Sequence, residues 1–514
     1  MKSPDFWKAI TALRQANEGQ SPLNRISAFK EAWKSAPNSL RRTLFRGLYT
    51  RINPSKLPPP NTHPSKTHYC RSRKDLSWAA SEIKRYISED LLFPNSDPRC
   101  LIHPWFVVYK RGKPRLVIDF LLLNNAILES PSVHYEDLRR VPSLVRRRVW
   151  MVSVDIKSAF HHVPLSPLFQ TLCSIEFEGQ VYSFRVLTFG INIAPRFWCL
   201  LLGHILEKLR SPPHSLKLIF YMDDILLVSR RRHTCYSHLH LLLSTLHSHG
   251  LVISWEKSVL TPTRSIRHLG FIINSETLSF TIPPDKLADI RSFLSTAASK
   301  PSLRFRSAQS LLGKLLSIHL AFAPAKRFSW RLCSEIYAQL PPLHALRRVR
   351  NTFRLILSPS AREDLRWIHS NIARSPSRSF SITTPTHYVY TDASLTGWGC
   401  FSPSTHQLAY GHWSRAVRQN PPHIQLLEME AVAHAISSLS LPPHSRIHLY
   451  TDNQAVLAYL KKWGGTRSPA LRDLTFKVWD IAIARRFTID QVSYIPSASN
   501  SVADQLSRIP PPNW

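Results

Sequence analysis

Two groups of acidic residues stand out because their carboxylates border apolar segments that are typical of strands. In the first acidic group, Asp155 ends the run VWMVSVD, and Asp223 and Asp224 are adjacent within LIFYMDDILLV. An acidic hairpin turn alone would also explain adjacent aspartates. If the two segments pair, however, three carboxylates converge at one sheet edge and repel one another unless divalent cations neutralise them. Two Mg²⁺ ions about 4 Å apart activate a hydroxyl and stabilise a leaving pyrophosphate, which is nucleotidyl transfer.

The elements that must position these residues fall into four segments. Residues 1–75 are basic and Pro-rich, with the stiff stretch LPPPNTHPSK, and partial disorder is expected there. Short strands alternate with helices over 76–290, where the helical pattern YSHLHLLLSTLHSHG ends at a glycine. Residues 291–383 are helical and strongly basic. The stretch SPSRSF marks a boundary, and strands and helices resume over 384–514.

Composition indicates the partner and the compartment. The 514 residues include 67 Lys and Arg against 33 Asp and Glu, a formal charge of +34. Such a surplus favours a polyanionic partner, with nucleic acid ahead of an acidic membrane surface. Seven cysteines without a C-x-x-C pair predict neither a disulfide framework nor a zinc ribbon. Without a signal peptide or a long apolar run, we expect an intracellular protein, cytoplasmic or nuclear and not secreted.

The motifs around the first acidic group resemble, in order, those of reverse transcriptases. They are KPRLVIDFLLLNNAI, VSVDIKSAF, VLTFGINIAPRFW, YMDD, WEKSVL and HLGFII. Several motifs in the same order are more specific than any one of them. The resemblance implies a right-hand polymerase with fingers, palm and thumb. It also implies that Asp155, Asp223 and Asp224 bind metal, with Asp155 and Asp223 indispensable.

The same resemblance implies roles around the nucleotide. Arg115 matches the fingers arginine that grips the triphosphate, a task suited to a guanidinium fork, and Lys113 assists it. Phe160 matches the ring that excludes a ribose 2′-hydroxyl, although plain core packing would explain it too. Gly190 would let the backbone approach the nascent base pair. Lys257 aligns with a lysine that protonates pyrophosphate, and a solvated surface lysine is the alternative.

Two further positions match the family, and one departs from it. Leu269 and Gly270 resemble the hairpin that grips the primer. Thr188 occupies a position where the family usually has Pro. This difference concerns the local turn and leaves the predicted chemistry unchanged.

The second acidic group lies in the C-terminal segment. Asp392 falls on a strand in HYVYTDASLTGWGCF, Glu428 on a helix in QLLEMEAVAHAI, Asp452 at a strand-to-helix junction in RIHLYTDNQAVLAYL, and Asp504 on a terminal helix in NSVADQLSR. Asp452 as a helix N-cap and Glu428 on a solvated face are the structural alternatives. The order of strand, helix, strand and helix with these four acids resembles the ribonuclease H fold, which implies hydrolysis of RNA in a hybrid with two metal ions.

Details of this segment refine the resemblance. Glu430 is the rival for the helix position, and Glu428 is preferred because it precedes MEAV as the glutamate of the family does. The loop YIPSASNSVAD lacks the histidine that many ribonucleases H have before the last aspartate. The stretch from KKWGGTRSP to ADQLSR is most similar to the ribonuclease H segment of DIRS-like retrotransposons, which integrate with a tyrosine recombinase.

The combined prediction is an α+β multidomain protein: a right-hand polymerase followed by a connection segment and a ribonuclease H-like α/β domain. Its predicted function is to copy retroelement RNA into DNA and degrade the RNA of the hybrid. Each active site is expected to use two Mg²⁺ ions, with Mn²⁺ as the alternative. Expected partners are an RNA template, a DNA primer, RNA/DNA hybrid and deoxynucleoside triphosphates, and no membrane. The element's recombinase and capsid protein are expected on other chains.

Three other functions compete with this prediction. An inactive, basic nucleic-acid-binding relic would keep the fold, but all seven expected acids are present. An RNA-dependent RNA polymerase would leave a hybrid-cutting domain without a purpose. A polymerase of the hepadnavirus type shares YMDD but needs a long protein-priming domain, for which only residues 1–75 are available.

Overall fold

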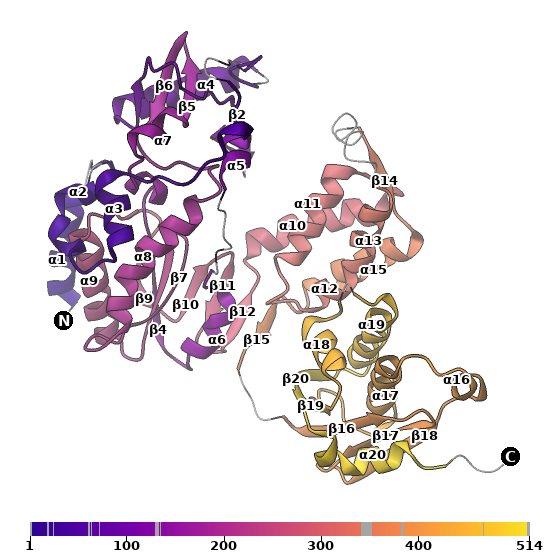
Figure 1. The fold of residues 1–514 in the computed structure, drawn as a ribbon. Helices are drawn as coiled ribbons and strands as arrows, with labels where there is room; N and C mark the ends of the chain where they lie inside the picture. The colour runs from indigo at the N-terminus through magenta and orange to yellow at the C-terminus, as the bar shows by residue number, and fades with distance from the viewer. Residues whose placement is uncertain are drawn as a thin grey trace. The chain divides into compact units, whose positions relative to one another are not determined.

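A computed structural model of the chain describes residues 3–17, 20–23, 25–59, 62, 64–70, 72–110, 112–128, 133, 135–340, 352–381, 385–465 and 467–510. They belong to two compact units, Met1–Phe280 and Thr281–Trp514, whose elements are labelled in Figure 1. Three features of the sequence lie at least partly outside the described residues. These are Pro60, Asn61 and His63 of the Pro-rich stretch, Thr466 of the GGTRSP motif, and the boundary predicted between residues 383 and 384.

The centre of the first unit is a four-stranded antiparallel sheet in the order β7-β8-β4-β9. Its strands are Lys217–Tyr221, Asp224–Ser229, Trp150–Asp155 and Val259–Thr263. The inner strands β4 and β8 are buried after their first residue, in keeping with their Val- and Leu-rich sequences. Helices α8 (Ala194–Arg210) and α9 (Arg232–Ser248) lie beside this sheet (Figure 1). The helix predicted before Gly250 is therefore present, and Gly250 has a positive φ of 81°.

Smaller elements surround this sheet within the first unit. Helix α4 (Arg73–Ser88) begins at Ser72, whose hydroxyl accepts a hydrogen bond from the Asp75 amide. Strands β1 (Leu92–Pro94), β6 (Gln180–Phe184) and β5 (Ser174–Phe177) form a second sheet. Two hairpins complete the described strands up to residue 274: β2 (Trp105–Lys110) with β3 (Lys113–Ile118), and β10 (Ser265–His268) with β11 (Phe271–Asn274).

The N-terminal segment, where the sequence predicts partial disorder, contains α1 (Ser3–Asn17), α2 (Arg25–Ala28) and α3 (Asn38–Arg46). Two aromatic residues of this segment, Phe6 and Trp33, are fully buried. The Phe6 ring lies 4.7 Å from that of Tyr236 in α9. The Trp33 indole donates a hydrogen bond to the His249 carbonyl at 3.2 Å. This N-terminal segment thus shares the hydrophobic core of the central sheet.

The second unit begins with a helical part. Its helices are α10 (Pro284–Ser299), α11 (Phe305–Leu316), α12 (Pro324–Phe328), α13 (Trp330–Ala338) and α15 (Pro359–Ile372). A short strand, β13 (Ser302–Arg304), pairs with β14 (Arg354–Ile356). The boundary predicted at residue 290 falls inside α10, because this helix starts directly after Pro283.

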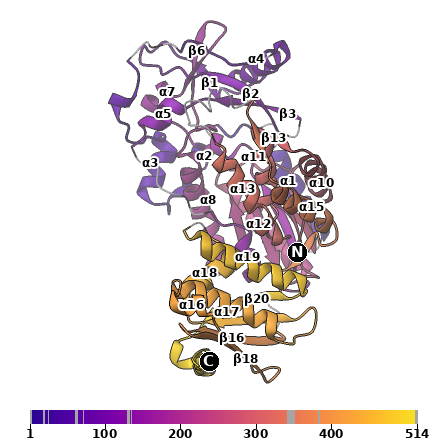
Figure 2. The ribbon, with the colours of Figure 1, turned by 90° about the vertical axis from the view of Figure 1, so that its right-hand side faces the viewer.

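The second unit ends with a five-stranded sheet in the order β18-β17-β16-β19-β20. The strands are Gln407–His412, Gly397–Ser402, His387–Ala393, Arg446–Thr451 and Thr488–Tyr494. The first three are antiparallel, and β19 runs parallel to both β16 and β20. Helices α17 (Ile424–Ser438), α18 (Gln454–Lys462) and α19 (Pro469–Ala484) lie on one side of the sheet, and α20 (Ser501–Ser507) lies on the other (Figures 1 and 2).

The helical part and the sheet part of the second unit meet where α12 contacts α19. Arg327 of α12 is 5% exposed and pairs with Asp480 of α19 at 2.8 Å. Its guanidinium lies 4.4 Å from the centre of the Phe476 ring, also on α19. A paired, hydrogen-bonded cation over an aromatic ring can be buried here at tolerable cost.

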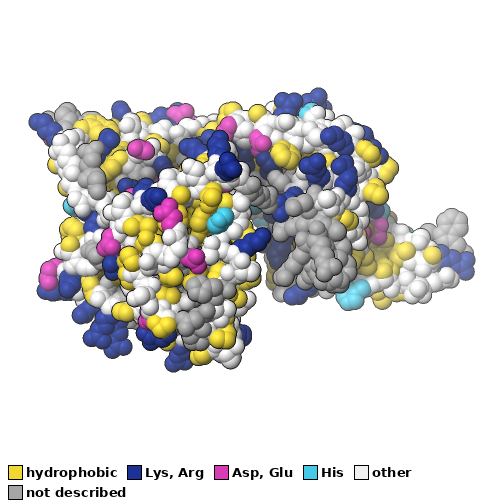
Figure 3. All heavy atoms as spheres, turned by 90° about the horizontal axis from the view of Figure 1, so that it is seen from above, with side chains coloured by type: hydrophobic (Ala, Val, Ile, Leu, Met, Phe, Trp, Pro, Cys, Tyr) yellow, Lys and Arg dark blue, Asp and Glu magenta, His cyan; other side chains and the backbone are white. Residues whose placement is uncertain are grey.

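The surface reflects the basic composition. On the face shown in Figure 3, Lys and Arg side chains are spread widely, with acidic side chains scattered singly among them. Within the described ranges, none of the helices combines the length and apolar character needed to span a bilayer.

Candidate active sites

The register of β4 against β8 brings the first acidic group together. Asp155 at the end of β4 lies directly opposite Asp224 at the start of β8. Asp223 lies in the β7–β8 turn after Met222, which has a positive φ of 57°. The Ile156 amide donates a hydrogen bond to the Asp223 carbonyl at 3.0 Å. The structure therefore contains the pairing of β4 with β8 that the prediction of three converging carboxylates required.

Burial gives this group unusual electrostatics. Asp155 is 7% exposed, and its Oδ1 is buried without a hydrogen-bond partner. Burial raises the pKa of Asp155, an effect that Lys257 opposes from 3.6 Å away and that Asp223 reinforces. Burial, followed by repulsion from Asp223 and Asp155, raises the pKa of Asp224 to about 6. Carboxylate oxygens are ligands that suit a divalent cation, whose charge would favour the ionised forms, but one oxygen from each of these three acids does not come within 4.8 Å of the others.

Two side chains that the sequence analysis did not single out hold this site. The Ser258 hydroxyl accepts a hydrogen bond from the Asp155 amide at 3.0 Å. The Trp198 indole donates to the Met222 carbonyl at 2.9 Å and so fixes the turn that carries Asp223. Both residues lie inside quoted motifs, WEKSVL and VLTFGINIAPRFW, so position in the motif was the available signal.

The segments that carry Phe160 and Gly190 are in contact, because the Phe160 ring packs against Phe189, the residue before Gly190. The Phe160 ring is 4% exposed and lies 4.8 Å from that of Phe189, which is 59% exposed. Gly190 has a positive φ of 103°, and an added Cβ would come within 3.1 Å of the Ile118 carbonyl and the Phe120 ring. Glycine at position 190 is therefore also explained by close packing of this loop against Ile118 and Phe120. This reason adds to the predicted approach of the backbone to a base pair.

The remaining predicted polymerase residues lie on two hairpins. Lys113 and Arg115 are exposed on β3, and no hydrogen bond or ion pair in the described part of the chain links either to the first acidic group. Leu269 and Gly270 form the two-residue turn between β10 and β11, with φ values of 45° and 80°. Positive φ at both turn positions matches the twist of a tight hairpin.

In the second acidic group, one ligand oxygen each of Asp392, Glu428 and Asp452 lies within 4.8 Å of the others. Asp392 is near the end of β16, Glu428 is on α17, and Asp452 directly follows β19. Asp504 does not belong to this close cluster, and its Oδ1 accepts hydrogen bonds from Arg508 at 2.6 and 2.8 Å. The structure thus brings three of the four predicted acids together.

Two structural alternatives for this group do not match the geometry. The N-cap of α18 is Asn453, whose side chain accepts hydrogen bonds from the amides of residues 455 and 456, and not Asp452. Glu428 is 5% exposed instead of solvated. Its rival Glu430 is turned to Lys477, with which it pairs at 3.2 Å.

The electrostatics of the second group are those of a crowded, buried acid cluster. Burial, followed by Asp392 and Asp452, raises the pKa of Glu428 to about 9. Burial also raises the pKa of Asp392 to about 6, although a hydrogen bond from Ser507 opposes the shift. The Oε2 atom of Glu428 is buried without a hydrogen-bond partner. Oxygen ligands at this spacing with an unsatisfied atom fit a divalent cation.

Serine side chains from the C-terminal stretch support these acids. The Ser507 hydroxyl donates to Asp392 Oδ2 at 2.8 Å, and Ser497 donates to Asp452 Oδ2 at 2.7 Å. Asn500 donates to the Thr391 carbonyl at 3.0 Å and ties the same stretch to β16. No local pattern in the sequence identifies these partners, because each contact joins segments far apart in the chain.

Comparisons with known proteins agree with the fold, and the segment that one family model matches contains the first acidic group. The family model described as "Reverse transcriptase (RNA-dependent DNA polymerase)" matches residues 108–273. The retrovirus-related Pol polyprotein from transposon opus of Drosophila melanogaster is 25% identical over 448 residues, covering 84% of this chain and 42% of that protein. The Gag-Pro-Pol polyprotein of Human T-cell leukemia virus 3 (strain Pyl43) is 29% identical over 256 residues, covering 46% and 17%. This chain therefore spans less than half the length of either relative.

Solved structures share the fold. A foamy viral protease-reverse transcriptase in complex with double-stranded DNA aligns with a TM-score of 0.54 at 16% identity, covering 97% of this chain and 98% of that one. The same viral protein with an RNA/DNA hybrid gives a TM-score of 0.53 at 15% identity, covering 95% and 64%.

The class of fold follows from these findings. The chain has the fold of a right-hand polymerase followed by a ribonuclease H-like α/β domain, as the sequence predicted. More narrowly, it contains a reverse transcriptase domain of the type found in retroviral and retrotransposon Pol polyproteins.

Proposed function

We propose that this chain is an RNA-directed DNA polymerase with a fused ribonuclease H, which copies retroelement RNA into DNA and degrades the RNA of the hybrid. The observation that carries the proposal is the placement of Asp155 opposite Asp224 inside a reverse transcriptase domain. The close group of Asp392, Glu428 and Asp452 in a domain of ribonuclease H-like fold supports the second activity.

Divalent cations, Mg²⁺ in the first instance, would supply an activated nucleophile and charge neutralisation at each acidic group. The residues around the cations position the carboxylates and supply a proton. In the first site, Ser258 and Trp198 fix the strand end and the turn that carry the carboxylates. Lys257, which is held near Asp155, can deliver a proton to departing pyrophosphate. In the second site, Ser507 and Ser497 orient Asp392 and Asp452.

Substrates and lineage are part of the same proposal. The RNA template, DNA primer and deoxynucleoside triphosphates would bind the first unit, with Arg115, Lys113, Phe160 and Gly190 at the nucleotide and Leu269 and Gly270 at the primer. Solved neighbours bound to double-stranded DNA and to an RNA/DNA hybrid support nucleic-acid partners. The GGTRSP and ADQLSR motifs support a DIRS-like retrotransposon lineage.

The test is primer extension on a homopolymeric RNA template with Mg²⁺, run beside cleavage of a labelled RNA/DNA hybrid. Asp223→Asn should abolish DNA synthesis and leave hybrid cleavage intact, and Asp452→Asn should do the reverse. Each variant serves as the folding control of the other. Loss of both activities from either folded variant would contradict two independent sites. A wild-type chain that binds hybrid but performs neither reaction would instead identify an inactive relic.

A further inference from the structure

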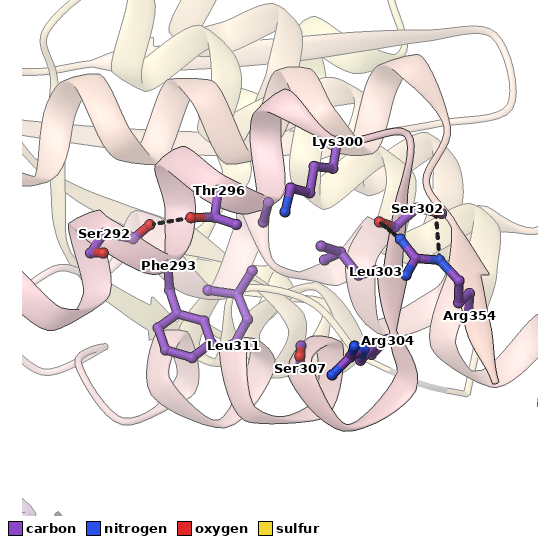
Figure 4. Close-up of a pocket in the computed structure, with 11 residues that line it drawn as sticks. Ser292, Phe293, Thr296, Lys300, Ser302, Leu303, Arg304, Ser307, Leu311 and Arg354 are labelled. Carbon is purple, nitrogen blue, oxygen red and sulfur yellow. Dashed lines mark hydrogen bonds between the residues drawn. The ribbon is translucent and has the colours of Figure 1, made fainter. Parts of the chain in front are cut away.

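A cavity of about 370 Å³ opens in the helical part of the second unit, between α10, β13, α11 and β14 (Figure 4). Its floor is apolar, since Ala297, Leu303 and Leu311 are at most 7% exposed. Its rim carries three cations, Lys300, Arg304 and Arg354, with serine and threonine hydroxyl groups between them. None of these residues belongs to either acidic group.

No acidic residue balances the charge among the described residues that line this cavity. The eleven lining residues include no Asp or Glu. Asp289, one turn before Phe293 on α10, pairs with Lys314 instead. Within the described residues, neither the Lys300 ammonium nor the Arg304 guanidinium has a hydrogen-bond or ion-pair partner. In Figure 4 the Lys300 ammonium points toward the middle of the cavity, and the Arg304 guanidinium lies beside Ser307.

The pairing of β13 with β14 makes this arrangement costly. Arg304 lies directly opposite Arg354 in the antiparallel register. Like charges in directly opposite positions destabilise a strand pair, and this sheet has only two strands. Arg354 is also fixed in place, because its Nε donates to the Ser302 hydroxyl at 3.1 Å and its Nη2 to the Ser302 carbonyl at 3.2 Å. An anion held between the two guanidinium groups would remove the repulsion.

We propose that this cavity binds a phosphate group. Guanidinium groups bind phosphate through paired, charge-assisted hydrogen bonds, and hydroxyl groups complete such a shell. The volume accommodates a phosphate together with the sugar that carries it. Two sources have this chemistry, namely a backbone phosphate of a nucleic acid strand and a small free phosphate compound. This phosphate site is separate from the two acidic groups, and its test does not depend on whether the chain is catalytically active.

The first experiment measures phosphate binding by calorimetry on the full-length chain, with inorganic phosphate and tripolyphosphate as probes. Arg304→Gln should weaken tripolyphosphate binding about tenfold or more, since one charge-assisted hydrogen-bonding group is lost. The same variant should raise the melting temperature in phosphate-free buffer, because repulsion with Arg354 is removed. The matched control is Arg306→Gln, an exposed residue of α11 that does not line the cavity, and it should change neither value.

A second measurement separates the two sources. If the cavity takes a backbone phosphate, Arg304→Gln should weaken binding of a short RNA/DNA hybrid and lower the slope of log K against log salt by about one, whereas Arg306→Gln should not. If it takes a free phosphate compound, only tripolyphosphate binding should respond to Arg304→Gln. Equal behaviour of the two variants toward both probes would overturn the proposal, whether or not the chain polymerises DNA.

Discussion

Replacing Glu428 by Gln should stabilise the metal-free protein at alkaline pH. Glu428 is 5% exposed, and its Oε2 has no hydrogen-bond partner. Asp392, Asp452 and Asp504 all add repulsion to the effect of burial, and the pKa of Glu428 rises from 4.5 to about 9. The folded chain therefore holds a proton that the unfolded chain releases. Stability should fall as pH rises between these two pKa values, because the folded state binds more protons there than the unfolded state does.

The size of this effect has an upper limit. At about pH 8 the unfolded carboxyl is ionised and the folded one is mostly protonated, so the free energy of unfolding is lower by at most about 5 kcal/mol. Entry of water and small movements reduce such penalties, and we expect a loss on the order of 1–3 kcal/mol. Gln has nearly the same shape and no charge. Its gain over Glu should therefore be large at about pH 8 and small at about pH 5.

The assay is denaturant unfolding in EDTA at both pH values, with the transition of the second unit followed separately. The control is Glu430→Gln on the same helix, where the carboxylate is paired with Lys477 at the surface, and it should change stability by less than about 0.5 kcal/mol. Mg²⁺ should stabilise the wild type more than Glu428→Gln. If Glu428→Gln destabilises the protein equally at both pH values, the carboxylate is not held protonated and the reasoning is wrong.

Three other predictions concern the polymerase half and the whole surface. Phe160→Val should raise ribonucleotide incorporation relative to deoxynucleotide incorporation by about tenfold to a hundredfold, and an unchanged ratio with a lower melting temperature would assign Phe160 to the core instead. Ser258→Ala removes the acceptor of the Asp155 amide. It should lower stability by about 1 kcal/mol and slow DNA synthesis while hybrid cleavage, measured in parallel, continues at the wild-type rate. Hybrid binding should weaken steeply between about 50 and about 200 mM salt, because a chain of charge +34 releases counterions on binding, and a nearly flat plot would exclude this.

Sequence reasoning reached the features that depend on local pattern. A strand ending in Asp155, a hairpin carrying Asp223 and Asp224, and a helix carrying Glu428 can each be read from residues near them in the chain. Their convergence required assuming how strands pair, and the register of β4 with β8 agrees with that assumption.

Features that depend on contacts between distant segments could not be predicted. The hydrogen bond of Ser507 with Asp392 joins α20 to β16, and composition around Ser507 carries no sign of it. The sequence also could not predict that Arg304 lies opposite Arg354, because the register of two strands depends on the fold around them. For Asp504, the sequence correctly predicted the helix that carries it. The carboxylate nevertheless forms an ion pair with Arg508 on the same helix.

The contact between α12 and α19 bears on where this chain can be divided into fragments. The boundary suggested by sequence, near residue 384, would separate Asp480 from the Arg327 guanidinium and uncover the Phe476 ring, which is now 8% exposed. A fragment that starts at residue 384 would then expose an apolar surface and leave Asp480 without its partner. We therefore expect a stable C-terminal fragment to include the helical segment before residue 384 and to begin near residue 281, where the second compact unit begins.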